Sequence, residues 1–187
     1  TDGRLFVANQ HDVFRFVAPE KPAGRGQWQR LALTLKPDQG INTILGDSGG
    51  ALWIGTWHGL LKYRDREQTV YTSEQGLSDN HILSLAEDHD GNLWIGTLGG
   101  GVCKLAGELI VSFTRTEGLP NQDVRKVIED RRGRIYASVS NGGLVEIVGR
   151  KAVPIRESQA LPFSNFNERI LQDQYGDWWI GTDGGQF

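Results

Sequence analysis

The residues of this sequence best suited to chemistry are amides, imidazoles and an indole. Amide side chains can hydrogen-bond hydroxyl groups while an aromatic face covers a sugar ring, which favours binding of a small molecule or an oligosaccharide. The same residue types also cap turns and satisfy loop backbone, and Asn80 and Asn121 share one position in two repeats, as structural bonding would require. The candidate ligand-binding residues are Trp57, His58, Asn80, His81, Asn121, Gln122, Asn141, Asn165 and Asn167.

Metal and catalytic chemistry find little support in the sequence. Residues 88–92 (DHDGN) resemble the start of a calcium loop but lack the glutamate that closes one. The four histidines show no metal-ligand spacing. Glu87 and Asp88 are neighbours on a predicted strand, as are Glu129 and Asp130, so each pair points to opposite faces and does not suit acid–base work. The sequence therefore predicts no catalytic residue, no metal and no cofactor.

Composition excludes several classes of partner. The chain has 187 residues, with 20 Lys plus Arg against 23 Asp plus Glu, for a net charge of −3. Nucleic acids and anionic membranes need clustered basic residues, which are absent, so neither is an expected partner. The hydrophobic fraction of 38% is enough to build a core. Apolar runs fall far short of the roughly 20 residues that span a bilayer, so this segment is expected to be soluble.

An internal repeat must position the candidate residues. LWIGT occurs at Leu52–Thr56 and Leu93–Thr97, with WWIGT at Trp178–Thr182 and weaker copies at Ile135–Val139 and residues 5–9, which gives a period near 42. Each copy follows an acidic turn with glycine, which is the chemistry of a tight hairpin. Around the hairpin lie four short apolar runs without helical spacing. A four-stranded unit of this length is typical of a propeller blade.

The predicted fold class is therefore all-β. We expect a β-propeller fragment of four-stranded antiparallel blades, about four to four and a half repeats. The repeats run roughly over residues 1–40, 41–80, 81–123 and 124–167, with an incomplete one at 168–187. The chain does not begin with Met, starts before a second strand and ends within a third. We therefore expect it to be part of a longer propeller.

Alignment of the third strands predicts how the blades pack. One column is charged in each of the four longer copies, as at Lys62 and Lys104, and its flanking columns are apolar. The lone cysteine, Cys103, falls in an aliphatic column, which favours a small core residue over a nucleophile and excludes an internal disulfide. The Trp of LWIGT is expected to wedge between neighbouring sheets rather than to stack on a ligand.

Antiparallel order also predicts where the candidates lie. Loops from a fourth strand to the next first strand, and loops from second to third strands, should open on one face. All nine candidates fall in these loops. The acidic hairpins should emerge on the opposite face.

Three stretches of the chain resemble the two-component regulator propeller repeat. They are residues 74–105 (EQGLSDNHILSLAEDHDGNLWIGTLGGGVCKL), 116–147 (TEGLPNQDVRKVIEDRRGRIYASVSNGGLVEI) and 171–185 (LQDQYGDWWIGTDGG). The first copy of the repeat matches the family pattern poorly, and the copy at residues 116–147 has Tyr136 in place of the Trp.

The resemblance implies a role in signalling. Proteins of this family are typically extracytoplasmic sensor regions of membrane-bound hybrid histidine kinases or related enzymes. By this resemblance, the segment lies on the periplasmic or extracellular side of a bacterial membrane protein and has no catalysis of its own. It would bind a small molecule, in several members an oligosaccharide, and signal through the arrangement of self-associated receptor chains.

Two alternatives remain open from the sequence. Propeller enzymes of the streptogramin-lyase or carbohydrate-active type carry similar repeats, and His58 or His81 would be the nearest base in such a reaction. A scaffold for protein contacts would share the same fold and would show an apolar patch on one face.

Overall fold

Strands joined by tight turns make up almost all of the computed structural model, which describes residues 5–19, 25–36, 38–160, 170–182 and 185–186. They form five antiparallel sheets, each ordered as its strands follow along the chain. The first sheet contains β1 (Phe6–Ala8), β2 (Val13–Val17) and β3 (Gln27–Arg30). The second contains β4 (Ile41–Gly46), β5 (Leu52–Thr56), β6 (Gly59–Arg64) and β7 (Glu67–Tyr71). The third contains β8 (Ile82–Glu87), β9 (Leu93–Thr97), β10 (Val102–Ala106) and β11 (Leu109–Phe113). The fourth contains β12 (Val124–Glu129), β13 (Ile135–Val139), β14 (Gly143–Val148) and β15 (Lys151–Pro154). The fifth contains β16 (Ile170–Gln172), β17 (Trp178–Thr182) and β18 (Gly185–Gln186).

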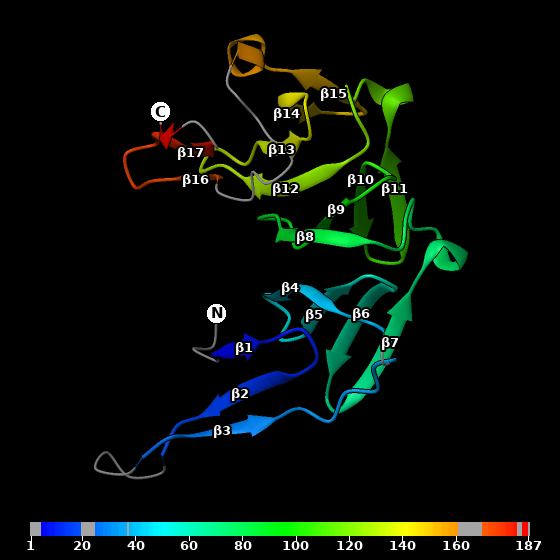
Figure 1. Cartoon of the computed structure of the whole chain (residues 1–187), viewed down its shortest axis with the longest axis vertical. Coiled ribbons are helices and arrows are strands. Elements are labelled where there is room, and N and C mark those ends of the chain that lie inside the picture. Colours follow the sequence, from blue (N-terminus) through cyan, green and yellow to red (C-terminus); the bar gives the residue numbers. More distant parts are fainter. Residues whose placement is uncertain (1–4, 20–24, 37, 161–169, 183–184, 187) are drawn as a thin grey trace.

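The sheets fan out around a common side of the molecule. Figure 1 shows the first strands β4, β8 and β12 on the inner side of the crescent and the fourth strands β7, β11 and β15 on its outer rim. Strand β8 packs against both β4 and β12, so the inner strands join neighbouring sheets. This arrangement of antiparallel meanders, three of them four-stranded and two three-stranded in the described residues, confirms the predicted propeller fragment.

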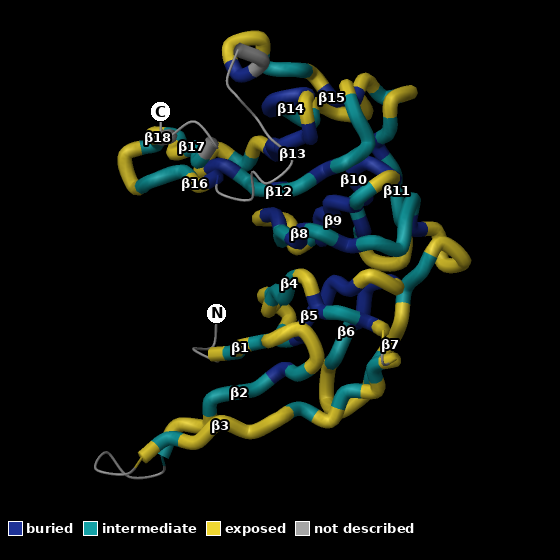
Figure 2. Tube along the Cα trace, in the orientation of Figure 1, coloured by how far each residue is buried: buried dark blue, intermediate teal, exposed yellow. Residues whose placement is uncertain are grey.

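The hydrophobic core lies between the sheets rather than within one of them. Figure 2 shows buried residues concentrated on the second strands β5, β9 and β13, which are buried along their whole length. One cluster joins Trp53 of the second sheet to Leu93 and Cys103 of the third, and another joins Trp94 to Val127 of the fourth. Trp53 and Trp94 are therefore wedges between sheets, and Cys103 is a fully buried core residue, as the sequence predicts.

The glycine of LWIGT lets adjacent sheets approach closely. A Cβ on Gly55 would come within 2.6 Å of Ile82 Cγ2 in the next sheet, and one on Gly96 would lie 2.9 Å from the Val124 carbonyl oxygen. Contacts this short would force the sheets apart.

The aspartate of each acidic hairpin has two structural roles. Asp88 Oδ1 accepts from the backbone N–H of Asp90 and of Asn92, which closes the turn, while Oδ2 accepts from Trp94 Nε1 at 2.8 Å. Burial alone would raise the pKa of Asp88, but the hydrogen bonds from Trp94 and Asn92 outweigh it and hold the pKa below its ordinary value. The carboxylate thus ties the hairpin to the indole that packs the core. The same pairing joins Asp47 to Trp53 and Asp173 to Trp179.

In the copy that lacks the indole, another donor takes its place. Asp130 Oδ2 accepts from Arg134 Nε at 2.8 Å, and the Arg134 side chain also lies over the ring of Tyr136. The change from Trp to Tyr is therefore accompanied by a change in the donor.

In the third, fourth and fifth sheets, the residue before the hairpin aspartate accepts a hydrogen bond from the preceding sheet. Glu87 accepts from the backbone N–H of Ser48, and Glu129 accepts from that of His89. Gln172 accepts in the same way from Arg131. The paired carboxylates at 87–88 and 129–130 therefore point to different partners and have structural roles.

Short 3-10 turns connect the sheets, a feature that the sequence reading does not include. Thr72 caps η1 (Ser73–Gln75), and Thr114 caps η2 (Arg115–Glu117), each in a reciprocal capping box. A third turn, η3, spans Arg156–Ala160. None of the helices among the described residues is long and apolar enough to cross a membrane.

Candidate functional site

The loops that carry the candidates meet on one face, which we call the loop face. In the second, third and fourth sheets, the turn between the second and third strands bonds to the loops that precede the first strands. Gly59 N donates to the Asn80 carbonyl at 2.8 Å, Leu98 N to that of His81 at 3.0 Å, and Ser140 N to that of Asp123 at 2.9 Å. These bonds hold the turns and the connecting loops in one layer. The acidic hairpins lie at the other strand ends, on a surface that we call the hairpin face.

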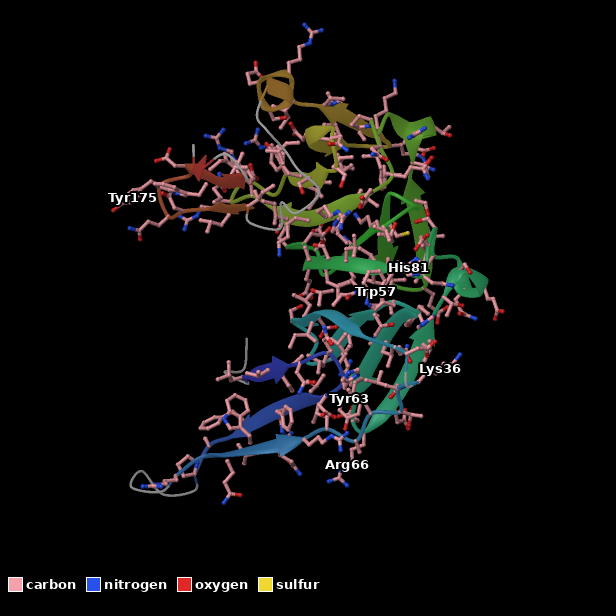
Figure 3. The ribbon with its side chains drawn as sticks, in the orientation of Figure 1. Lys36, Trp57, Tyr63, Arg66, His81 and Tyr175 are labelled. Carbon is pink, nitrogen blue, oxygen red and sulfur yellow. The ribbon has the colours of Figure 1, made fainter. Side chains whose placement is uncertain are left out.

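Two aromatic candidates come together at the seam between the second and third sheets. The rings of Trp57 and His81 lie edge to face with their centroids 5.6 Å apart, and Figure 3 shows both side chains at this seam. Trp57 remains 41% exposed. A Cβ on Gly40 would lie 2.9 Å from Trp57 Cδ1, so the indole covers the loop that precedes β4. An aromatic surface therefore lies open on the loop face.

Two histidines beside this surface are each paired with an aspartate. His58 Nε2 lies 3.1 Å from Asp38 Oδ2, and His81 Nδ1 lies 3.2 Å from Asp79 Oδ1. Both imidazoles are partly exposed. A carboxylate beside an imidazole fixes the orientation of the ring and the nitrogen that carries the proton. The seam thus offers an indole face flanked by oriented polar groups.

Three of the amide candidates bond within one loop or between two loops. Asn80 Oδ1 accepts from Ser73 N at 2.7 Å, Asn121 Nδ2 donates to the Ser140 carbonyl at 3.1 Å, and Gln122 Nε2 donates to the Gly99 carbonyl at 2.7 Å. Their amides are therefore engaged in positioning the loop face, which agrees with the structural alternative stated for Asn80 and Asn121.

The remaining candidates have less structural context. Asn141 is exposed and has a φ of 53°, a left-handed conformation that Asn tolerates better than most residues. It lies at the turn of the fourth sheet, beyond the Trp57 and His81 seam. Asn165 and Asn167 lie outside the described residues.

A polar network in the fourth sheet is missing from the sequence-based set. Arg125 Nη2 donates to Asp123 Oδ2 at 2.6 Å and Arg125 Nε to Ser140 Oγ at 3.1 Å, while the Ser140 hydroxyl donates to the same carboxylate oxygen at 2.9 Å. The other oxygen, Asp123 Oδ1, is buried without a hydrogen-bond partner. Arg125 and Ser140 replace the leucines that occupy these repeat positions one copy earlier, and that departure is the signal that could have identified the network.

Within the described part of the chain, no group of three or more His, Cys, Asp or Glu could hold a metal ion. The loop face offers polar groups for hydrogen bonds and an aromatic surface.

Comparison with known family models finds a match to three stretches of the chain. A family model described as two component regulator propeller matches residues 36–58, 76–99 and 160–184. No curated protein matches the chain.

Solved structures share the fold at low sequence identity. The extracellular domain of the system BT4673 from B. thetaiotaomicron, described as a hybrid two component system, matches with a TM-score of 0.72 and 20% identity over 97% of this chain. The corresponding domain of BT3049 from the same organism matches with a TM-score of 0.68 and 20% identity over 90%. Virginiamycin B lyase from Staphylococcus aureus, solved with quinupristin as an inactive variant, matches with a TM-score of 0.72 and 12% identity over 100%.

The chain spans only part of each of these proteins. It covers 27% of the BT4673 chain, 24% of the BT3049 chain and 66% of the lyase chain.

Proposed function

We propose that this chain, three stretches of which match the two component regulator propeller model, is a non-catalytic, ligand-sensing segment of a membrane-bound signalling receptor. The proposal places the segment on the periplasmic or extracellular side of a bacterial membrane, and the similar B. thetaiotaomicron domains are described as extracellular. Self-association of full-length receptor chains would carry the signal onward.

The observation that carries the proposal is the exposed indole of Trp57 at the seam between two sheets. Sugar rings bind through an aromatic face together with a few oriented polar groups, and His58 and His81 supply such groups beside the indole. A ligand bound across this seam would contact two sheets at once. Its binding would therefore favour one arrangement of those sheets, which is the property that a sensor needs.

A sugar-library binding screen with purified chain tests the proposal. Trp57→Ala should weaken binding of any library hit by about tenfold or more, since it removes the aromatic face. Trp28→Ala is the matched control, because Trp28 is also about half exposed (49%) but lies on β3, away from the loop face. Hits that bind equally well to wild type and to Trp57→Ala would contradict the proposed site.

A lyase-type enzyme is the second candidate, and the two His–Asp pairs favour it. Incubation of the chain with quinupristin, followed by mass spectrometry of the peptide, separates the two. Under the sensor proposal the peptide stays intact, whereas its conversion by wild type but not by His58→Ala or His81→Ala would establish the enzyme.

A further inference from the structure

A cavity of about 520 Å³ lies between the first and second sheets, away from the loop face. It is lined by residues of β2, β3 and β6 and by the turns that end on the hairpin face. Figure 3 places two of its lining residues, Tyr63 and Arg66, beside the end of β3. The cavity therefore belongs to a part of the molecule that the proposed sensing site does not use.

The lining carries a strong excess of positive charge. Arg15, Arg30, Arg64 and Arg66 line the cavity together with a single acid, Asp65. The chain as a whole is negative, with a net charge of −3. Four guanidinium groups in one cavity repel each other unless anions lie between them.

The protein's own carboxylates neutralise only part of this charge. Arg30 Nη2 lies 2.5 Å from Asp12 Oδ1. Arg64 Nε lies 3.5 Å from Asp65 Oδ2 in an exposed ion pair. Among the described residues Arg15 has only a neutral partner, donating from Nη2 to Gln29 Oε1 at 3.0 Å. Its Nε is buried and has no hydrogen-bond partner. A buried donor without an acceptor is costly, so the protein itself satisfies the Arg15 guanidinium only in part.

A tight turn brings Arg66 to this cavity. The turn between β6 and β7 holds Asp65 at a φ of 51° and Arg66 at 68°. The equivalent turns of the next two sheets start with Gly107 and Gly149, whose φ values are 62° and 59°. Two left-handed residues in a row are the backbone of a type I′ hairpin turn, and this conformation is unfavourable for most side chains other than glycine. The turn thus holds Arg66 at the edge of the cavity.

We propose that this cavity is an anion-binding site that takes a carboxylate or sulfate group, either as a free ion or carried by an acidic sugar. Arg15 and Arg66 are its direct ligands, because guanidinium groups match both oxyanions with paired hydrogen bonds. Phe6 and Tyr63 supply the apolar part of the wall, which suits the body of an organic ligand. The site is separate from the Trp57 seam and does not depend on it.

Titration calorimetry on the full chain tests the site with four probes: inorganic sulfate, trigalacturonate, a sulfated chondroitin disaccharide and neutral maltotriose. The three anions are the candidates, and maltotriose is the uncharged comparison. We expect at least one anion to bind, with an affinity that falls as sodium chloride is raised. Binding of sulfate alone identifies the free ion as the ligand, whereas tighter binding of a sugar acid identifies the sugar.

Arginine variants locate the binding. Arg66→Gln, on an exposed turn, should weaken anion binding by about tenfold, and Arg66→Lys should restore only part of it because the paired hydrogen bonds are lost. Arg132→Gln removes the same charge from an exposed position of another hairpin and should leave binding unchanged. Arg15→Gln should abolish binding, and its melting curve shows whether it is folded.

The proposal is wrong if none of the three anions binds at millimolar concentration. It is equally wrong if Arg132→Gln weakens binding as much as Arg66→Gln does, since that result would reflect net charge alone. Trp57→Ala should keep full anion binding, so failure of the sensing site and failure of this site are distinguishable.

Discussion

At the scale of single residues, the acidic hairpin shows how one carboxylate joins local and tertiary structure. Asp88 closes its own turn with one oxygen and holds the Trp94 indole with the other. In the fourth sheet Arg134 donates to Asp130 instead, and Tyr136 stands where the indole would be. In this copy the donor and the aromatic residue therefore differ together.

This pairing predicts a rescue. Trp94→Tyr removes the indole donor to Asp88 and should lower the free energy of unfolding by about 1–3 kcal/mol, measured by urea denaturation. Adding Asn92→Arg reproduces the arrangement at Arg134 and should recover part of that loss. Tyr136→Phe is the control. Because Arg134 already donates to Asp130, this variant should change the free energy of unfolding only slightly. A double variant no more stable than Trp94→Tyr would contradict the exchange.

The pair formed by His89 and Glu129 predicts that the stability of the protein depends on pH. The hydrogen bond from the ring to Glu129 and the charge of Asp90 raise the pKa of His89 above its ordinary value of 6.5. A raised folded-state pKa adds stability below the unfolded pKa, and this stability is lost as the pH rises through the folded pKa. The stability advantage of wild type over His89→Gln should therefore be larger near about pH 6 than near about pH 8. An advantage that does not change over this range would show that the protonated pair contributes nothing.

At the scale of elements, sheet-to-sheet distance depends on residues without side chains. Gly55 lies against both Ile82 of the next sheet and Thr43 of its own, and Gly96 lies against Val124. The fourth sheet has the small, buried Ser138 at the same repeat position. The inner strands also carry one irregularity each, between residues 41 and 43, 82 and 84, and 124 and 126. A bulge increases local twist, which suits strands that fan around a common side.

A methyl group at this contact should be poorly tolerated. Gly55→Ala should lower the free energy of unfolding by about 1–3 kcal/mol, because its Cβ would lie 2.6 Å from Ile82 Cγ2. Gly46→Ala is the matched control in the preceding strand, where a Cβ would meet nothing within 4 Å. Chemical denaturation of both variants measures the difference. Equal stabilities for the two would show that the sheets can separate without cost.

At the scale of the whole molecule, the two proposed sites occupy opposite faces of the fan. The Trp57 seam lies where the connecting loops meet, and the arginine-lined cavity lies toward the hairpins between the first two sheets. Position in the fan also decides burial: Trp94 is 4% exposed between two sheets, whereas Trp179, which keeps its bond to Asp173, is 50% exposed in the fifth. These two copies thus make the same local contact, and neighbouring sheets decide how far the indole is buried.

The period of about forty residues, the strand pattern and the acidic turns could be read from the amino-acid order, because alternation and turn chemistry are local properties of the chain. The core position of Cys103 and the common face of the loops followed from aligning the repeats.

Contacts between sheets could not be read in this way. Arg15 and Arg66 share a cavity, and Trp57 meets His81, only because packing brings distant segments together. Asn80 and Asn121 look like ligand donors in isolation, yet folding supplies them with backbone partners. Whether a polar side chain is free for a ligand depends on those neighbours, and neighbours across a sheet boundary are set by three-dimensional packing.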